Sequence, residues 1–291
     1  MKRMIKTKLG AALMILLILA LLAGCGKGGN SSSGGSSEST VDTYNEKLNI
    51  YCFDAGKADS FLLYTENSAV LIDCGEKGFG KEILAKLDEL GITKLDHLII
   101  THFDKDHVGG AAKVINNFPV ENLIVSDYPK DSEEYEKYQK AITNAGLDEN
   151  ILRTSLSFTL DGVTYTIDPP AKTNYNSDDS NNSSLIVSVR NGENSFLFTG
   201  DAQDERIKEF VLGNKENYDV LKCPYHGNYQ DSLSALLGSV QPSYVIITSS
   251  DDEPEDQKTL DLITSAGAQS YLTRKGSVLI TSDGKKISIR Q

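Results

Sequence analysis

The chain has 291 residues, of which 29 are basic and 41 acidic, and its formal net charge at pH 7 is −12. A surplus of negative charge helps solubility and opposes strong non-specific binding to DNA or to anionic lipid. The composition therefore counts against a processive nuclease, although a local basic strip would be compatible with one.

Residues 1–24 resemble the signal peptide of a bacterial lipoprotein. Four basic residues lie within the first eight positions, and an almost wholly apolar run follows over 9–22. That run is shorter than the ~20 residues of a membrane-spanning helix. Leu22-Ala23-Gly24-Cys25 resembles a lipobox, which implies cleavage before Cys25, lipidation of Cys25 and anchoring on the extracytoplasmic face of the cell membrane. An ordinary signal peptide and an uncleaved anchor are the alternatives.

Residues 25–46 are rich in Gly and Ser, which predicts a flexible tether. Residues 47–291 have the length of one domain. Three cysteines remain there, and an odd number excludes a complete disulfide framework. Cys52 and Cys74 lie in apolar strand contexts and are expected to be small buried residues. A Cys52–Cys74 bridge is the alternative, which geometry would have to decide.

The first half of the domain predicts strands with interleaved helices. Apolar runs bounded by turn residues predict strands over 48–53, 61–64, 69–72, 97–100 and 123–126. Helical spacing of apolar residues predicts helices over 81–90, 111–116 and 131–145.

The second half of the domain also predicts strands with interleaved helices. A strand pair is predicted within 155–167 around Asp161-Gly162, followed by a polar loop over 173–183 and a hairpin around Asn191-Gly192. Further strands are predicted near 244–248, 278–281 and 286–289, and helices over 204–212 and 256–266. Composition and periodicity alone support a single domain of mixed α and β structure.

The most informative stretch is THFDKDHVGG at 101–110, directly after the apolar run Leu98–Ile100. Imidazole nitrogen and carboxylate oxygen together suit zinc, manganese or iron. Carboxylates clustered this closely repel one another unless a cation lies among them. The glycines Gly109 and Gly110 are expected to let the backbone turn. The alternative is a polar surface loop that binds no metal.

This stretch resembles the signature loop of the metallo-β-lactamase superfamily, whose usual form is His-x-His-x-Asp-His. Asp104 in place of the second histidine is similar to the competence-type ComEC branch, a relative of the nuclease-like domain of DNA-uptake channels. The resemblance covers roughly residues 48–290. It implies an α+β fold, the four-layer αββα sandwich, with the site at strand ends between the two sheets.

The resemblance also implies a ligand set for one or two divalent ions, zinc or manganese: His102, Asp104, Asp106, His107, Asp201 and His226. Asp201, in Thr199-Gly200-Asp201, would bridge two ions, and the alternative is that it caps the following helix. One ion would be held by Asp106, His107, Asp201 and His226. The second position, with His102, Asp104 and Asp201, is rich in carboxylates. This favours manganese there, or a position that binds its ion only weakly.

A second segment, LKCPYHG at 221–227, resembles the superfamily's Leu-Lys-x-x-His-His-Gly, with Tyr225 in place of the first histidine. Three catalytic roles follow from the resemblance. Asp106 would orient the nucleophile, Lys222 would reach an anionic substrate, and Tyr225 would donate to a developing oxyanion. Supporting positions around the site are expected at Asp54, Lys57, Asp59 and Asp73, and His97 is expected to be structural.

Two features depart from the superfamily pattern. No histidine lies between 107 and 226, and Asn181 and Asn182 stand in the region of the missing one. The late Gly-His-Pro loop is replaced by Ser249–Glu255, which contains Asp251, Asp252 and Glu253. These departures keep a non-catalytic, metal-binding surface module open as an alternative.

The expected function is a surface-anchored hydrolase that uses metal-activated hydroxide, with a phosphodiester or another anionic molecule as substrate. A β-lactamase is disfavoured because Asp104 breaks the His-x-His pair. The only partner implied is the membrane, through the lipid anchor, and the sequence implies no stable protein partner.

Overall fold

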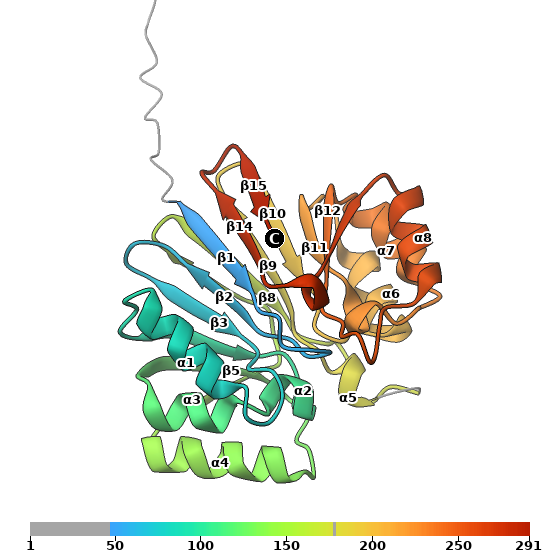
Figure 1. Ribbon diagram of the computed structural model, residues 1–291. Helices are drawn as coiled ribbons and strands as arrows, with labels where there is room; N and C mark the ends of the chain where they lie inside the picture. The colour runs from blue at the N-terminus through green and yellow to red at the C-terminus, as the bar shows by residue number, and fades with distance from the viewer. Residues whose placement is uncertain (1–46, 177–178) are drawn as a thin grey trace, which may run out of the picture. The chain divides into compact units, whose positions relative to one another are not determined.

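Alternating apolar side chains form a core between two β-sheets. In β1 (Leu48–Cys52) every second side chain is buried in this core, and β8 (Val163–Asp168) of the other sheet shows the same alternation. Side chains of successive strand residues point to opposite faces, so this pattern places one face of each sheet in the shared core. The computed structural model describes residues 47–176 and 179–291 (Figure 1).

The first sheet has eight strands in the spatial order β15-β14-β1-β2-β3-β4-β5-β6. Neighbours from β3 to β6 are parallel, and the other neighbours are antiparallel. Besides β1, its strands are β2 (Phe61–Tyr64), β3 (Ala69–Ile72), β4 (Leu95–Ile100), β5 (Val120–Ser126), β6 (Glu149–Leu152), β14 (Val278–Ser282) and β15 (Ile287–Arg290).

The second sheet has seven strands in the order β13-β12-β11-β10-β9-β8-β7. Neighbours from β10 to β13 are parallel, and those from β7 to β10 are antiparallel. Besides β8, its strands are β7 (Leu156–Leu160), β9 (Ile186–Asn191), β10 (Asn194–Phe198), β11 (Val220–Lys222), β12 (Tyr244–Ile247) and β13 (Gln269–Leu272).

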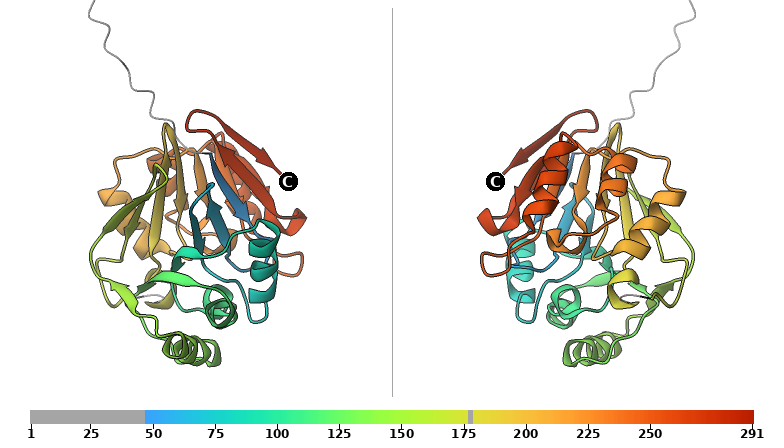
Figure 2. Two further views of the ribbon diagram at one scale, coloured as in Figure 1. Left: turned by 90° about the vertical axis from the view of Figure 1, so that its left-hand side faces the viewer. Right: turned by 90° about the vertical axis from the view of Figure 1, so that its right-hand side faces the viewer.

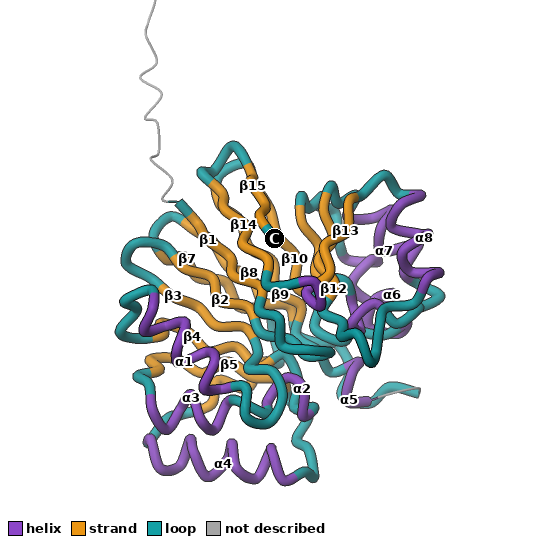
Figure 3. Tube along the Cα trace, in the orientation of Figure 1, coloured by secondary structure: helices purple, strands orange, loops and turns teal. Residues whose placement is uncertain are grey.

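Helices cover the outer face of each sheet (Figures 1 and 2). The outer face of the first sheet packs against α1 (Gly80–Glu89), α2 (Lys105–Val108), α3 (Ala111–Asn117) and α4 (Glu133–Ala145). The outer face of the second packs against α6 (Asp204–Gly213), α7 (Leu233–Val240) and α8 (Gln257–Ser265). The predicted four-layer αββα sandwich is therefore confirmed, and Figure 3 shows its strands and helices by colour.

Most predicted elements are present, with shifts at their ends. The strands predicted over 61–64 and 69–72 have those bounds, and the predicted turn at Asp161-Gly162 joins β7 to β8. The polar loop predicted over 173–183 was wrong in part, because it contains the short helix α5 (Asp179–Asn182). The sequence analysis missed α7 and the edge strands β6 and β13.

The cysteines and His97 are part of the packed interior. Cys52, Cys74 and Cys223 are buried free thiols, so the alternative of a Cys52–Cys74 bridge is not realised. Burial raises the pKa of all three thiols, to about 12 for Cys223. His97 stacks on Phe158 across the two sheets, with ring centroids 3.9 Å apart, as expected of a structural residue.

No helix in the described ranges is both long and apolar enough to cross a membrane. The predicted signal peptide and tether, residues 1–46, lie outside the described residues, so lipidation of Cys25 stays a prediction.

A buried arginine ties α6 to the sandwich. The guanidinium of Arg206 donates to the backbone oxygens of Ser184 and Asp168, at 3.1 and 2.6 Å, and pairs with the carboxylates of Asp168 and Glu209 at 2.9 and 2.8 Å. The side chain of Arg206 is 0% exposed. A buried charge of this kind is stable only with its partners, and replacement leaves those partners unpaired.

We expect Arg206→Met to lower the free energy of unfolding by roughly 3–5 kcal/mol, the usual cost of breaking a buried ion pair. Urea denaturation followed by circular dichroism measures it. The control is Arg153→Met, which removes a surface pair with Asp127 and should change stability by less than about 1 kcal/mol. Equal losses in the two variants would contradict the role given to Arg206.

Candidate metal centre

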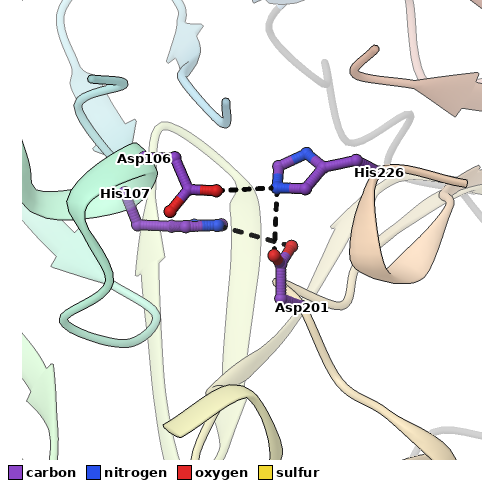
Figure 4. A group of neighbouring side chains, drawn as sticks. All are labelled: Asp106, His107, Asp201 and His226. Carbon is purple, nitrogen blue, oxygen red and sulfur yellow. Dashed lines mark hydrogen bonds and ion pairs between the residues drawn. The ribbon is translucent and has the colours of Figure 1, made fainter. Parts of the chain in front are cut away.

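The candidate site lies where parallel strands of both sheets end. Strand β4 leads into α2, which carries Asp106 and His107, while β10 leads into Asp201 and β11 leads into the 224–227 turn with His226. The carboxyl ends of parallel strands lie at the same edge of a sheet, and loops at such an edge commonly form binding sites. Figure 4 shows the four side chains converging from these segments.

The four side chains form one compact group. Their candidate ligand atoms all lie within 4.8 Å of one another. His226 Nε2 is 3.0 Å from Asp201 Oδ2 and 3.2 Å from Asp106 Oδ2, and His107 Nε2 is 3.4 Å from Asp201 Oδ1 (Figure 4). Only Asp106 is partly exposed, at 21% of its side chain, so solvent reaches the group from the Asp106 side.

The buried carboxylate of Asp73 orients His107. The ring donates from Nδ1 to Asp73 Oδ2 at 2.8 Å, and Thr101 donates to the same carboxylate through its backbone N–H and its hydroxyl, at 2.8 and 2.6 Å. With Nδ1 carrying the proton, Nε2 is left to face Asp201. Carboxylates commonly orient metal-binding histidines in this way.

His226 is oriented by the loop after β12. Its Nδ1 donates to the backbone oxygen of Thr248 at 3.0 Å, and the Thr248 hydroxyl lies 2.9 Å from the same nitrogen. That hydroxyl donates to Asp59 Oδ1 at 2.7 Å. The Nε2 atom of His226 therefore faces Asp106 and Asp201. Thr248 had no role in the sequence analysis, because no motif marks it.

Strained backbone is concentrated at the site. Asp73, Tyr225 and His226 have φ values of 57°, 49° and 54°, in the left-handed region that non-glycine residues avoid. This conformation costs roughly 1–2 kcal/mol per residue for L-amino acids. Among the described non-glycine residues, only two others share it, Asp161 and Gln241. Strain retained at clustered polar residues is typical of functional sites.

Lys222 lies behind the group and is 1% exposed. Its ammonium contacts Asp59 Oδ2 at 2.6 Å, Asp201 Oδ1 at 3.3 Å and the backbone oxygen of Gly200 at 2.9 Å. In this arrangement it neutralises two buried carboxylates and does not face solvent. The predicted contact of Lys222 with a substrate therefore has no support from its position.

Opposite charges hold the group in its ionised state. Burial favours the neutral form of Asp201, but His226, His107 and Lys222 outweigh it and hold the carboxyl pKa well below its usual range. Burial likewise opposes protonation of His226, but Asp201 and Asp106 raise its pKa to about 9. The pKa of His107 is raised against burial by Asp201 and Asp73. Without a metal, protons therefore balance the carboxylates, and a bound cation would replace them.

The donor set fits a divalent metal ion. Two imidazole nitrogens and two carboxylates are the ligands that zinc, manganese and iron accept. Among the described side chains, His107 Nε2 is buried without a hydrogen-bond partner, which is unusual for a buried polar atom. A metal ligand needs such an available nitrogen.

The other two predicted ligands do not join this group. His102 Nε2 contacts Asn181 Oδ1 at 3.1 Å. Asp104 is paired with Lys130, whose Nζ lies 2.5 Å from Asp104 Oδ1, and it also accepts from the Ser180 hydroxyl. Among the described residues, His102 and Asp104 belong to no cluster of three or more metal-ligating side chains. A metal role for these two residues stays a prediction.

The structure also shows the positions of other residues that the sequence analysis singled out. Asp201 does not cap α6, because the backbone N–H groups of Gln203 and Arg206 donate to Asn182 Oδ1, at 3.2 and 3.0 Å. Tyr225 is half-buried beside His226 in the 224–227 turn. Asp54 is exposed and Lys57 half-buried in the turn that ends at Asp59.

The glycines of the loop have a different purpose from the one predicted. Gly109 and Gly110 have ordinary right-handed backbone conformations, with φ of −57° and −87°, so a turn does not require them. A Cβ atom at Gly109 would come within 2.4 Å of Lys77 N, and one at Gly110 within 2.3 Å of Cys74 O. These positions need glycine because the backbone after β3 approaches so closely.

Comparison with known proteins agrees with this geometry. A model of the metallo-beta-lactamase superfamily matches residues 54–247. The chain belongs to the metallo-beta-lactamase superfamily. Solved structures of the same fold include YhfI from Bacillus subtilis, with 14% identity, a TM-score of 0.50 and coverage of 84% of this chain and all of the other. CmlA, a diiron beta-hydroxylase from Streptomyces venezuelae, has 15% identity, a TM-score of 0.51 and coverage of 78% and 53%.

Distant sequence relatives are competence and recombination proteins. Recombination protein 2 of Haemophilus influenzae is 30% identical over 203 residues, covering 67% of this chain and 23% of the relative. ComE operon protein 3 of Bacillus subtilis is 30% identical over 220 residues, covering 67% and 27%, and Competence protein ComA of Neisseria gonorrhoeae is 27% identical over 207, covering 69% and 27%. The chain thus spans about a quarter of the length of these relatives.

Asp201→Asn should abolish tight metal binding, because the variant loses a ligand and the charge that balances His107, His226 and Lys222. Asp73→Asn should weaken binding roughly 10–100-fold, the usual effect of losing the carboxylate that orients a ligand histidine. Isothermal titration of zinc or manganese into chelator-stripped protein measures both.

The control is Asp251→Asn, an acid whose side chain is 82% exposed. It should bind metal like the wild type. Unchanged metal affinity in Asp201→Asn would show that the four-residue group is not the metal site.

Proposed function

We propose that this protein is a metal-dependent hydrolase of phosphodiester bonds, held at the outer face of the cell membrane by lipid on Cys25. The observation that carries the proposal is the group Asp106, His107, Asp201 and His226, which converges at one edge of the sandwich with one partly exposed carboxylate. Zinc and manganese are the metals that its nitrogen and carboxylate donors favour.

A divalent ion in this group would supply Lewis acidity, which lowers the pKa of water and offsets charge on a phosphoryl oxygen. The protein's own residues supply position and proton transfer. Asp106 is the member that solvent reaches, so its free carboxylate oxygen can orient the attacking water and accept its proton. Tyr225, half-buried beside His226, would donate to an anionic oxygen of the substrate.

Three considerations support a phosphodiester as substrate. The two imidazole nitrogens and two carboxylates suit zinc or manganese, ions that polarise a phosphoryl oxygen. The words recombination and competence in the names of the relatives favour nucleic acid or its fragments. The net charge of −12 opposes tight binding to long duplex DNA and so favours a small or short phosphodiester.

A second candidate is a metal-binding module without catalysis. The observation that favours it is the half of the site around His102 and Asp104, where both side chains are engaged by the protein's own Asn181 and Lys130. Such a module would bind the ion in the four-residue group and would catalyse no reaction.

Turnover separates the two candidates. Metal-loaded full-length protein should hydrolyse bis(p-nitrophenyl) phosphate, and Asp106→Asn should lower kcat by roughly 10²–10⁴, the usual contribution of a positioned proton acceptor. The metal content of each sample is measured in parallel, and Asp251→Asn serves as the control with wild-type kcat. Full metal content without hydrolysis of phosphodiester, phosphomonoester or lactam substrates would reject the proposal that the protein is a hydrolase.

The anchor has its own test. Cys25→Ser expressed in bacteria should leave the membrane fraction or accumulate unprocessed, because serine cannot carry the thioether-linked lipid. Immunoblots of membrane and soluble fractions measure it. Equal membrane retention of a normally processed Cys25→Ser protein would reject lipidation.

A further inference from the structure

The half of the site around His102 and Asp104 already contains a cation. The ammonium of Lys130 lies 2.5 Å from Asp104 Oδ1 and 2.7 Å from the Ser180 hydroxyl, which in turn donates to Asp104. Lys130 was no part of the predicted site, because it follows β5 and lies far in sequence from the histidine-rich loop. Its side chain is 32% exposed, so part of it is accessible to solvent.

His102 is engaged by the protein as well. Its Nε2 lies 3.1 Å from Asn181 Oδ1, and an amide oxygen only accepts hydrogen bonds. The Nε2 atom therefore carries the proton in this contact and has no lone pair for a metal. The other nitrogen, Nδ1, lies 3.3 Å from the Thr101 hydroxyl and 3.4 Å from that of Ser184, in the buried interior.

These contacts are built into the fold. Lys130 comes from the loop after β5, and Ser180 and Asn181 come from α5. The end of β5 is tied to the end of α5, because the Ser126 hydroxyl donates to the backbone oxygen of Ser183 at 2.6 Å. Two segments that are far apart in sequence thus present a cation, a hydroxyl and an amide oxygen to Asp104 and His102.

We propose that the centre binds a single divalent ion, in the group Asp106, His107, Asp201 and His226, and that the ammonium of Lys130 replaces a second ion beside Asp104. The charge of Asp104 is already balanced there. A divalent ion at Asp104 would have to displace the ammonium or lie beside it, and two cations a few ångströms apart repel strongly in a partly buried site. It would also have to break the His102–Asn181 contact.

This inference extends the proposed function to its substrate. In a centre with one ion, the partly exposed side chain of Lys130 would supply the second positive charge to an anionic substrate. The Lys130 ammonium is a fixed point charge with three donors, which suits a phosphoryl oxygen. Lys130 is thus a specificity-determining residue for anionic substrates, and this part of the inference rests on the proposed function. The inferred number of bound ions does not rest on the proposed function.

Counting manganese ions tests the inference without any activity assay. Full-length protein is stripped with a chelator, saturated with manganese and freed of excess by gel filtration, and the metal is counted by elemental analysis. Electron paramagnetic resonance then distinguishes an isolated Mn²⁺ ion from a spin-coupled pair. The wild type should hold one ion per chain with the spectrum of an isolated ion. Two ions with a coupled spectrum would overturn the inference.

Two variants sharpen the result. Lys130→Ala leaves Asp104 unbalanced, so at saturating manganese it should take up a second ion and show coupling, while Lys130→Arg keeps the charge and should hold one. The matched control is Lys137→Ala, which breaks another 2.5 Å lysine–carboxylate pair, with Glu133 on α4, and should also hold one ion. A single ion in Lys130→Ala would show that the ammonium does not stand in for a metal.

Hydrolysis is measured on the same samples, so the two failures can be told apart. Loss of the positive charge in Lys130→Ala should raise KM for an anionic phosphodiester about tenfold, the effect of roughly 1.4 kcal/mol of lost binding, with Lys130→Arg less affected. An unchanged KM would overturn the substrate role. One ion in the wild type without turnover on any substrate would reject the proposed function and leave the single-ion centre standing.

Discussion

The buried carboxylate of Asp201 is the charge on which the site depends. His226, Lys222 and His107 contact it at 3.0, 3.3 and 3.4 Å, and its side chain is 2% exposed. A charge buried this deeply is costly unless opposite charges and hydrogen bonds compensate it. Lys222 and His226 come from β11 and the 224–227 turn beside Asp201 in the second sheet, whereas His107 comes from α2 after the first sheet's β4. The compensation is therefore complete only when the two sheets have packed together.

A second layer of contacts keeps these partners in place. Asp73 holds His107, Thr248 holds His226, and Asp59 holds both Lys222 and Thr248. The left-handed backbone at Asp73 and His226 persists because these contacts outweigh its strain. The result is a rigid pair of imidazoles whose Nε2 atoms face the same small volume, which is the pre-organisation that a metal site requires.

The sequence was most informative where local patterns decide structure. Alternating apolar residues and the Asp161-Gly162 turn predicted the β7–β8 hairpin. The resemblance to the metallo-beta-lactamase superfamily implied that Asp106, His107, Asp201 and His226 act together, and the structure brings these four side chains into one group. The sequence analysis missed α7 although Leu233, Leu236, Leu237 and Val240 recur at helical spacing and are buried. Its exposed face carries small residues such as Ser234 and Gly238 in place of charged ones, which makes the polar side of the pattern weak. The strands β6 and β13 are short edge strands with little apolar content.

Tertiary pairing explains what the sequence could not reveal about the site. The separation between Asp104 and Lys130 is 26 positions, and the parallel pairing of β4 with β5 brings the segments that follow these two strands side by side. Lys222 appeared able to reach a substrate until its burial between Asp59 and Asp201 was visible. In both cases the charge was readable from sequence, but its partner was not.

Anomalous diffraction from crystals of the manganese-loaded protein tests the central claim most directly. One anomalous peak per chain should lie among Asp106, His107, Asp201 and His226, with the Lys130 ammonium still against Asp104. A peak between His102 and Asp104, or the absence of any peak in the four-residue group, would contradict the account.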